Sequence, residues 1–434
     1  MRVAVIGAGW AGLAAAVKAT QAGHAVTVFE ASRTLGGRAR AVTGTLPDGS
    51  PVGLDNGQHI LIGAYRETLR MMALVGADAS TGLCRMPLAL RFFDGSGVQF
   101  PKWPSPFDAL GGICGARGWS VLDKLSLLVA ATGWQLRRFK CSSSMTVSQL
   151  CASVRPRIMA ELIEPLCVSA LNTPAPRASG QVFLRVMKDA LFGGTGSSNL
   201  LLPKQDLTAL FPQAAADWLA SQGTEVRMGA RVDTLQADEP RRAWLVNGEV
   251  FDRVIWATST SNAALSLGKC AQAAPESIAS QLRTWIHVAE EMRFEAITTV
   301  YAYAANTSLP IPMLTLRSQS DSVNPAQFVF DRGQLGGPAG LFAFVVSASA
   351  GEREALEAAV LEQARTQLGL TLAPIQTIVE KRATFACTPG LARPPTQVAP
   401  GLLACGDYCE GPYPATLEGA VLSGLAAAKA MGSA

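Results

Sequence analysis

The sequence predicts an α/β protein of two domains, one of them a nucleotide-binding domain assembled from separated segments of the chain. Residues 2–30 read as strand, glycine-rich turn, helix and strand, which is the pattern of a βαβ unit. Residues 206–260 and the C-terminal region carry further patterns of the same kind. The 434 residues are enough for two domains that share a substantial core.

The N-terminal unit contains three predicted elements. Val3–Ile6 is a short apolar run typical of a buried strand. Leu13–Ala22 is rich in alanine and favours a helix. Ala25–Phe29, which the chain enters through Gly23, predicts the second strand.

The central region repeats this alternation. Asp206–Ser221 has the apolar spacing of a helix, and Glu225–Leu235 alternates like a strand. Trp244–Phe251 predicts a hairpin around Asn-Gly, and Arg253–Ala257 a buried strand.

The C-terminal region again predicts a strand, Leu402–Ala404, followed by a helix from Ala415 onward. We therefore expect the segments to form a nucleotide-binding domain and an α+β substrate-binding domain. The first is assigned residues 1–80, 200–262 and 395–434, and the second residues 81–199 and 263–394.

Composition limits the classes of function. Hydrophobic residues make up 49% and charged residues 16% of the chain, which is typical of a globular protein. The net charge of +4 without a long basic run argues against a nucleic-acid partner. The nine cysteines form no matched CxxC pairs, so we expect reduced thiols and no metal site. The first strand leaves no room for a signal peptide, and we expect a cytoplasmic protein.

One region suggests contact with a membrane. Residues 103–136 are rich in Trp, Phe and Leu, but no segment reaches the roughly 20 apolar residues of a membrane span. Val121–Leu136 comes nearest, and Asp123 and Lys124 interrupt it. The region is either a core helix or a surface that enters one leaflet of a bilayer.

The first chemical motif is a glycine turn between the first strand and the first helix. Gly7 permits the turn, Gly9 lets the backbone approach a pyrophosphate, and Gly12 allows close packing of helix on strand. The helix start at Trp10 and Ala11 offers free N–H groups to phosphate. The second strand ends at an acidic residue that can bind both ribose hydroxyls, and the predicted ribose contacts are Glu30 and Ala31.

A second motif indicates which dinucleotide the domain binds. The acid at Glu30 selects a ribose without a 2′-phosphate, as in FAD or NAD. Gly36 and Gly37 let the backbone lie against the ligand, and Arg38 can neutralise phosphate or contact the flavin edge. The pattern Glu-Ala-Ser-x-x-Leu-Gly-Gly-Arg-Ala resembles the FAD superfamily of amine oxidases and carotenoid desaturases. The resemblance implies a Rossmann-like FAD-binding domain.

Three further segments acquire roles from this resemblance. The segment Asp55–His59 resembles the one that passes the isoalloxazine in that superfamily. Gly406 and Asp407 would bind the ribityl or pyrophosphate region, and the helix that follows would point its positive end at the flavin. A strand near Val232 would meet the adenine. The contacts implied are Gly57, Gln58, His59, Val232, Gly406, Asp407, Ala415, Thr416 and Leu417.

The chain contains no second strand–Gly-x-Gly-x-x-Gly–helix unit. We therefore expect no separate domain for a nicotinamide cofactor. Reducing equivalents would come from an external electron donor, either a partner reductase or NAD(P)H that visits the flavin directly.

A narrower resemblance rests on four segments. They are similar to the squalene-associated, FAD-dependent, desaturase-like group: Asp55–Leu69, Ala170–Pro174, Asn199–Pro203 and Gly406–Ala420. The group implies that reduced FAD removes the hydroxyl of hydroxysqualene to give squalene, in squalene and hopanoid biosynthesis. Such a substrate requires a deep apolar tunnel, whose mouth would face the inner surface of the cell membrane.

The implied reaction requires a proton donor for the leaving hydroxyl. The candidates are His59, Tyr408, Glu410 and Tyr413, and spacing does not rank them. Each also has a structural interpretation, as a loop histidine, a core tyrosine or a solvated turn residue. The same cofactor motifs would serve a polyprenoid desaturase that uses oxidised FAD, a flavin amine oxidase, or a flavin-binding protein without enzyme activity.

Overall fold

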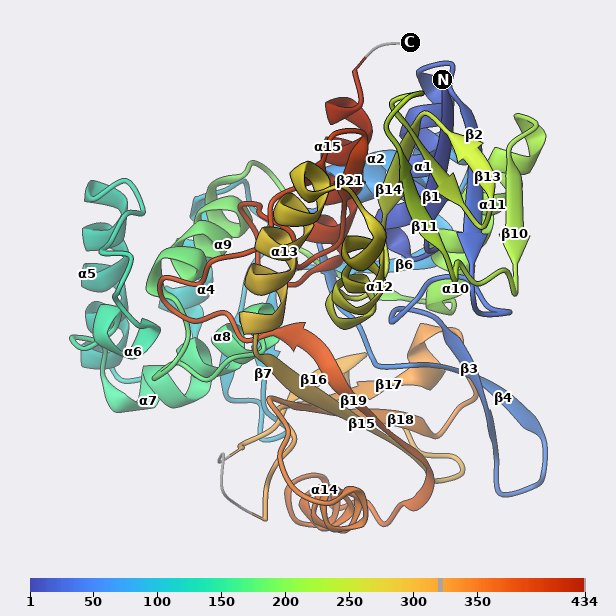
Figure 1. Ribbon diagram of the computed structural model, residues 1–434. Helices are drawn as coiled ribbons and strands as arrows, with labels where there is room; N and C mark the ends of the chain where they lie inside the picture. The colour runs from blue at the N-terminus through green and yellow to red at the C-terminus, as the bar shows by residue number, and fades with distance from the viewer. Residues whose placement is uncertain (319–322, 433–434) are drawn as a thin grey trace.

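A computed structural model describes residues 1–318 and 323–432 (Figure 1). A six-stranded sheet has the order β10-β2-β1-β14-β21-β20. Its strands come from three distant parts of the chain and all but β20 run parallel. They are β1 (Arg2–Ile6), β2 (Ala25–Glu30), β10 (Glu225–Met228), β14 (Arg253–Trp256), β20 (Gln397–Ala399) and β21 (Leu402–Ala404). The α/β fold class predicted from the sequence is confirmed.

Three helices pack beside this sheet: α1 (Trp10–Gln21), α11 (Pro212–Ser221) and α15 (Leu417–Ala430). Alanine and glycine let α1 and α15 approach closely, since a Cβ on Gly424 would lie 2.1 Å from the carbonyl oxygen of Ala11. The middle of α15 therefore packs against the start of α1.

A five-stranded antiparallel sheet forms the lower half of Figure 1, in the order β16-β17-β18-β15-β19. Helix α14 (Arg353–Leu368) covers one of its faces through a separate hydrophobic cluster. The strands are β15 (Phe294–Tyr303), β16 (Met313–Thr315), β17 (Phe328–Asp331), β18 (Leu341–Ser347) and β19 (Ala373–Phe385).

Helices gather at the left of Figure 1. They are α4 (Phe107–Gly115), α5 (Val121–Leu136), α6 (Val147–Leu150), α7 (Pro156–Ile158), α8 (Glu164–Leu171) and α9 (Gly180–Phe192), with a π-helical turn at Met159–Ile163. Among the described residues, none of the helices combines the length and hydropathy needed to cross a bilayer.

The remaining elements connect these layers. They are β3 (Ala41–Thr45), β4 (Pro51–Asp55), β5 (Leu61–Ile62), α2 (Arg66–Leu74), α3 (Ala79–Gly82), β6 (Leu83–Met86), β7 (Ala89–Arg91), β8 (Gly97–Gln99), β9 (Leu200–Pro203), α10 (Leu207–Leu210), β11 (Leu235–Asp238), β12 (Ala243–Val246), β13 (Glu249–Phe251), α12 (Thr260–Ala273), α13 (Glu276–Glu291) and a 3₁₀ turn at Arg332–Leu335.

Two predicted elements are wrong in extent. The helix expected over Asp206–Ser221 is split at Phe211, because Pro212 starts a new helix and has no N–H to continue the first one. The strand expected over Glu225–Leu235 stops at Met228, because Gly229 adopts φ +66° and turns the chain. The hairpin β12–β13 is confirmed, and the domain boundaries stay a prediction.

Candidate cofactor and substrate site

The glycine turn lies where β1 meets α1. Gly7 adopts φ +114°, and a Cβ there would meet the Ala257 carbonyl oxygen at 2.8 Å. A Cβ on Gly12 would lie 1.9 Å from the Gly7 oxygen, so only glycine lets the helix pack here. Gly9 is the N-cap of α1 without a side-chain cap. The first N–H groups of α1, at Trp10 and beyond, are therefore left for a ligand.

A cleft of about 660 Å³ starts at this turn. Glu30 lines it at the end of β2, where its carboxylate accepts the N–H groups of Ala8 (2.7 Å) and Ser32 (2.8 Å). Ala31 and Val232 also line the cleft, but Val232 lies in the loop after β10 and not in a strand as predicted. This end of the cleft combines an acid with exposed backbone, which is the chemistry that a ribose and adenine require.

Arg38 joins two of the predicted motifs. Its guanidinium forms an ion pair with Asp407 and donates to the carbonyl of Ala383 at 2.7 Å. Gly36 and Gly37 adopt positive φ angles beside it, and all of these residues line the cleft.

His59 lies in the middle of the cleft with Gly57 and Gln58. Its Nδ1 is 2.7 Å from the carbonyl oxygen of Gly57. Because a carbonyl only accepts, Nδ1 carries the proton of the neutral ring. Burial lowers the pKa of His59, and the nearby charge of Arg38 lowers it further. His59 is therefore neutral at neutral pH and poorly suited to act as an acid.

The far end of the cleft is formed by Gly406, Asp407 and the start of α15. The Thr416 hydroxyl caps this helix by accepting the N–H of Gly419 at 3.0 Å. Helix α15 begins at Leu417, two residues later than predicted, because Ala415 and Thr416 form the turn and the cap. Ala415, Thr416 and Leu417 all line the cleft.

Arg393 holds the loop between Gly406 and α15. Its guanidinium donates to four carbonyl oxygens, those of Asp407 (2.6 Å), Tyr408 (3.2 Å), Gly411 (3.2 Å) and Tyr413 (2.7 Å). It also stacks on the ring of Phe385, with 4.6 Å between Cζ and the ring centroid. The sequence analysis did not select Arg393.

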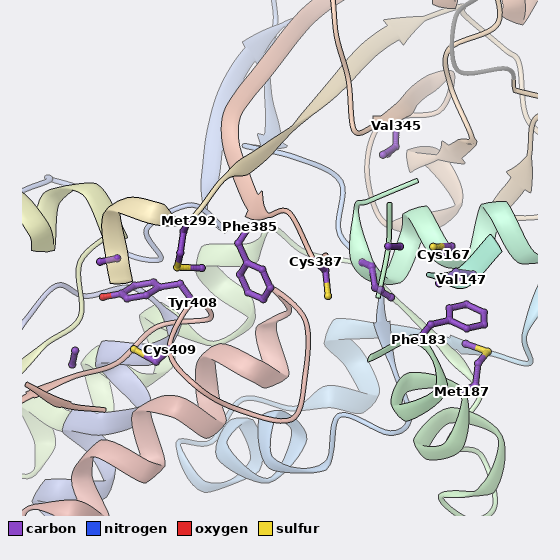
Figure 2. Close-up of a cluster of buried hydrophobic side chains, with 14 of the residues drawn as sticks. Val147, Cys167, Phe183, Met187, Met292, Val345, Phe385, Cys387, Tyr408 and Cys409 are labelled. Atoms are coloured by element: carbon purple, nitrogen blue, oxygen red, sulfur yellow. The ribbon is translucent and has the colours of Figure 1, made fainter. Parts of the chain in front are cut away.

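Two of the four predicted proton donors lie in unfavourable places. Tyr408 borders the cofactor cleft, but its side chain is only 2% exposed and its hydroxyl has no partner among the described residues. Figure 2 shows it within the hydrophobic cluster that also contains Met292 and Phe385. Glu410 is exposed and lines neither cavity of the site.

An apolar cavity of about 360 Å³ adjoins the cofactor cleft. Helices α4, α5, α8 and α9 supply half of the residues that line it. The two cavities share six lining residues: Ile60, Tyr65, Ser169, Ala170, Phe328 and Thr416. The ionisable residues that line the apolar cavity are Tyr65, Asp189 and Tyr413.

Tyr413, the fourth predicted donor, belongs to the polar group in this cavity. Its hydroxyl donates to Asp189 at 2.7 Å, and Arg185 pairs with the same carboxylate at 2.7 Å. Burial raises the pKa of Tyr413 to about 12, and the hydrogen bond to Asp189 adds to the shift. The phenol is therefore protonated at neutral pH. The structure thus places His59 and Tyr408 at the cleft and Tyr413 at the cavity.

Other lining residues were missed by the sequence analysis. Thr258 and Ser259 follow β14, next to β1 in the sheet, and line the cleft. Their position at the carboxyl end of a parallel strand could have identified them. Tyr65 and Asp189 carry no comparable sequence signal.

The residues fit a flavin dinucleotide. A Cβ on Gly9 would have nothing nearer than 3.9 Å, so this backbone faces open space in the cleft. The cleft then continues to the α15 N-terminus, whose partial positive charge favours the electron-rich end of a flavin. Fold and site define an FAD-dependent oxidoreductase.

Comparison with known proteins agrees. The model of the flavin containing amine oxidoreductase family matches residues 10–432, and the chain belongs to that family. It is 29% identical to hydroxysqualene dehydroxylase of Rhodopseudomonas palustris, over 98% of this chain and 97% of the relative. Identity to the protein of that name from Zymomonas mobilis is 25%, over the same shares. A solved oxidoreductase from Methanosarcina mazei has a TM-score of 0.73 at 15% identity, covering 99% of this chain and 100% of the other.

Proposed function

We propose that this protein converts hydroxysqualene to squalene by reductive loss of the hydroxyl group. The observation that carries the proposal is the apolar cavity directly beside the cofactor cleft. A C30 hydrocarbon with one hydroxyl needs an apolar container with very few polar groups. The names of the full-length relatives support the choice of substrate.

The overall reaction balances with one hydride and one proton. Reduced FAD, when bound, supplies the hydride that replaces the hydroxyl on carbon. The hydroxyl takes a proton and leaves as water. The apolar wall excludes bulk water, so a side chain in the cavity must provide that proton.

Tyr413 is the donor that the geometry favours. Among the four candidates, it alone lines the apolar cavity. Its phenol is protonated at neutral pH, so the proton is present for donation. In this proposal the phenol O–H turns from Asp189 to the substrate oxygen, and the resulting phenolate is stabilised by Arg185, whose Cζ lies 5.5 Å from the ring centroid. Asp189, with 22% of its side chain exposed, connects Tyr413 to solvent for reprotonation.

The test is a single turnover without oxygen. Chemically reduced enzyme incubated with hydroxysqualene should yield squalene, identified by gas chromatography and mass spectrometry. Oxidised enzyme incubated with squalene or phytoene should yield no desaturated product. Desaturation by the oxidised form, with no squalene from the reduced form, would establish the polyprenoid desaturase instead.

The proposal also specifies where the enzyme acts and what reduces its flavin. The substrate and product are lipids, so the enzyme would act on the inner face of the cell membrane, in squalene and hopanoid biosynthesis. Electrons would arrive from NAD(P)H or a reductase partner. Stopped-flow measurement of flavin reduction by NADH and NADPH would separate these two donors.

A further inference from the structure

A patch of large apolar side chains is exposed on α4, α5 and the segment before them. Within residues 1–318 and 323–432, thirteen large hydrophobic side chains are exposed, and eight of them lie between residues 103 and 136. Leu136 is 81% exposed and Val129 68%. A soluble surface rarely concentrates so much apolar area in one place. The eight residues, called the apolar patch below, are Trp103, Phe107, Leu110, Val121, Leu122, Leu125, Val129 and Leu136.

The apolar patch lies next to the apolar cavity. On α5 its members Val121, Leu125 and Val129 recur every four residues, so they share one face of the helix. Phe107 and Leu110 of α4 are exposed and also line the cavity. On α5, the exposed residues Thr132 and Gln135 do the same. These exposed lining residues place an opening of the cavity between α4 and α5, next to the patch, and the exposed Phe192 at the end of α9 lines the cavity as well.

The charges around the apolar patch have one sign. From residue 102 to residue 140, the two acidic side chains, Asp108 and Asp123, are buried and hydrogen-bonded. The basic side chains are exposed or half-buried, and none forms an ion pair with any described residue. They are Lys102, Arg117, Lys124, Arg137, Arg138 and Lys140.

We propose that the apolar patch inserts into one leaflet of a bilayer that contains anionic lipids, with the basic side chains at the headgroups. Apolar burial and attraction to anionic headgroups act together at such a surface. The cavity mouth then opens into hydrocarbon, so that a water-insoluble substrate passes from bilayer to cavity without crossing water. This surface goes beyond the proposed reaction, and only the passage of substrate rests on that reaction.

Vesicle co-sedimentation of the FAD-loaded protein tests the surface. Binding should be stronger to phosphatidylcholine mixed with phosphatidylglycerol than to phosphatidylcholine alone, and should weaken with added salt. Lys102→Glu/Lys140→Glu should reduce binding to the anionic vesicles by about tenfold or more. The matched control, Lys269→Glu/Lys429→Glu, makes the same change in net charge on α12 and α15, away from α5 (Figure 1), and should bind like wild type. An equal loss in both variants would contradict a localised surface.

The apolar contribution has its own variant. Val129→Ser/Leu136→Ser alters two exposed side chains that do not line the cavity. It should abolish vesicle binding while turnover of detergent-solubilised substrate stays unchanged. A different outcome would contradict the membrane proposal: the wild-type protein is a dimer in sedimentation velocity and does not bind vesicles, while the variant is a monomer. This outcome would show that the patch pairs two copies of the chain. Vesicle binding without any turnover of solubilised hydroxysqualene would reject the proposed reaction and leave the membrane surface standing.

Discussion

At the scale of single residues, the proposed proton transfer depends on the hydroxyl of Tyr413. Tyr413→Phe keeps the ring and removes the O–H that contacts Asp189. We expect the single-turnover rate with hydroxysqualene to fall by about a hundredfold or more, because a positioned acid contributes that much. The flavin absorbance spectrum should not change.

Tyr303→Phe is the matched control, since Tyr303 lies in β15 and lines neither cavity. It should retain the wild-type rate. If Tyr413→Phe also retained it, the proton would have to come from another group. The conservative variant Asp189→Asn should give an intermediate rate whose pH profile differs from that of wild type, because it removes the connection to solvent.

Asp55 provides a second residue-scale prediction, on stability. Burial raises the pKa of this carboxyl to about 7 from an ordinary value of 3.8, although the N–H of Leu207, at 2.8 Å, opposes the shift. Between these two pH values the folded state binds more protons than the unfolded state. The contribution of Asp55 to the free energy of unfolding therefore falls as the pH rises, and its loss is complete above about pH 7.

Asp55→Asn keeps an oxygen for the Leu207 N–H and cannot ionise. We expect it to raise the free energy of unfolding at pH 8 by about 1–3 kcal/mol relative to wild type, and by much less at pH 4. Urea denaturation at both pH values measures this difference. If Asp55→Asn changed the free energy of unfolding by the same amount at pH 4 and at pH 8, that result would contradict the raised pKa of Asp55.

Some residues of the site could be predicted from the sequence, and others could not. Gly7 and Gly12 were recognisable because part of their constraint is local: Gly7 turns the chain at φ +114°, and Gly12 packs against the Gly7 oxygen. Tyr65, Asp189 and Arg393 reach the site from separate segments and have ordinary surroundings in sequence. Their role depends on which segments meet, and that is decided by packing.

At the scale of elements, α15 stabilises a second helix. Glu418, in its first turn, accepts the N–H groups of Glu67 (3.0 Å) and Thr68 (2.8 Å) at the start of α2. A carboxylate at a helix N-terminus compensates for free N–H groups and for the helix dipole. The Thr68 hydroxyl also donates to it, at 2.7 Å.

Glu418→Gln should lower the free energy of unfolding by about 1–3 kcal/mol, because Gln has only one oxygen and its NH2 group cannot replace the second carboxylate oxygen as a buried acceptor. Chemical denaturation measures the change. Glu362→Gln, which disrupts an exposed ion pair within α14, should shift stability by less than about 0.5 kcal/mol. Equal effects at the two positions would argue against this role for Glu418.

Element boundaries were less predictable than element types. Pro212 and Gly229 each end a predicted element by a backbone property that the sequence already contains. The prediction gave more weight to the apolar residues on either side of Pro212 and Gly229 than to these two residues. The five-stranded sheet was not predicted strand by strand. Strands β16, β17 and β18 are consecutive in the chain and in the sheet, but β15 pairs with β18 and β19 rather than with the next strand in sequence, and packing decides that pairing.

At the scale of the whole molecule, residues of both large sheets line the cofactor cleft. The cleft is lined by Gly7 and Glu30 beside the parallel sheet and by Phe328, Val345 and Thr384 from the antiparallel one. FAD should therefore raise the melting temperature, because it binds only the folded arrangement. Gly12→Ala should lose this increase, since its Cβ would collide with the Gly7 oxygen.

Differential scanning fluorimetry with and without added FAD measures both effects. Gly268→Ala in α12 is the control, because a Cβ there has no heavy atom within 4 Å. It should retain the FAD-dependent increase and be as stable as wild type or more stable by about 0.5–1 kcal/mol. An FAD response that survives in Gly12→Ala would show that the glycine turn is dispensable for binding.

Arg393 donates to four carbonyl oxygens of one loop, and this has a consequence for how the enzyme can change over time. The loop carries Asp407 of the cofactor cleft at one end and Tyr413 of the apolar cavity at the other, and the same guanidinium anchors both. A lineage that adapts the cavity to a different lipid by shifting this loop would also disturb the contacts around the flavin. Selection is therefore expected to remodel α4, α5 and α9 first, where the cavity wall can vary without moving the redox centre.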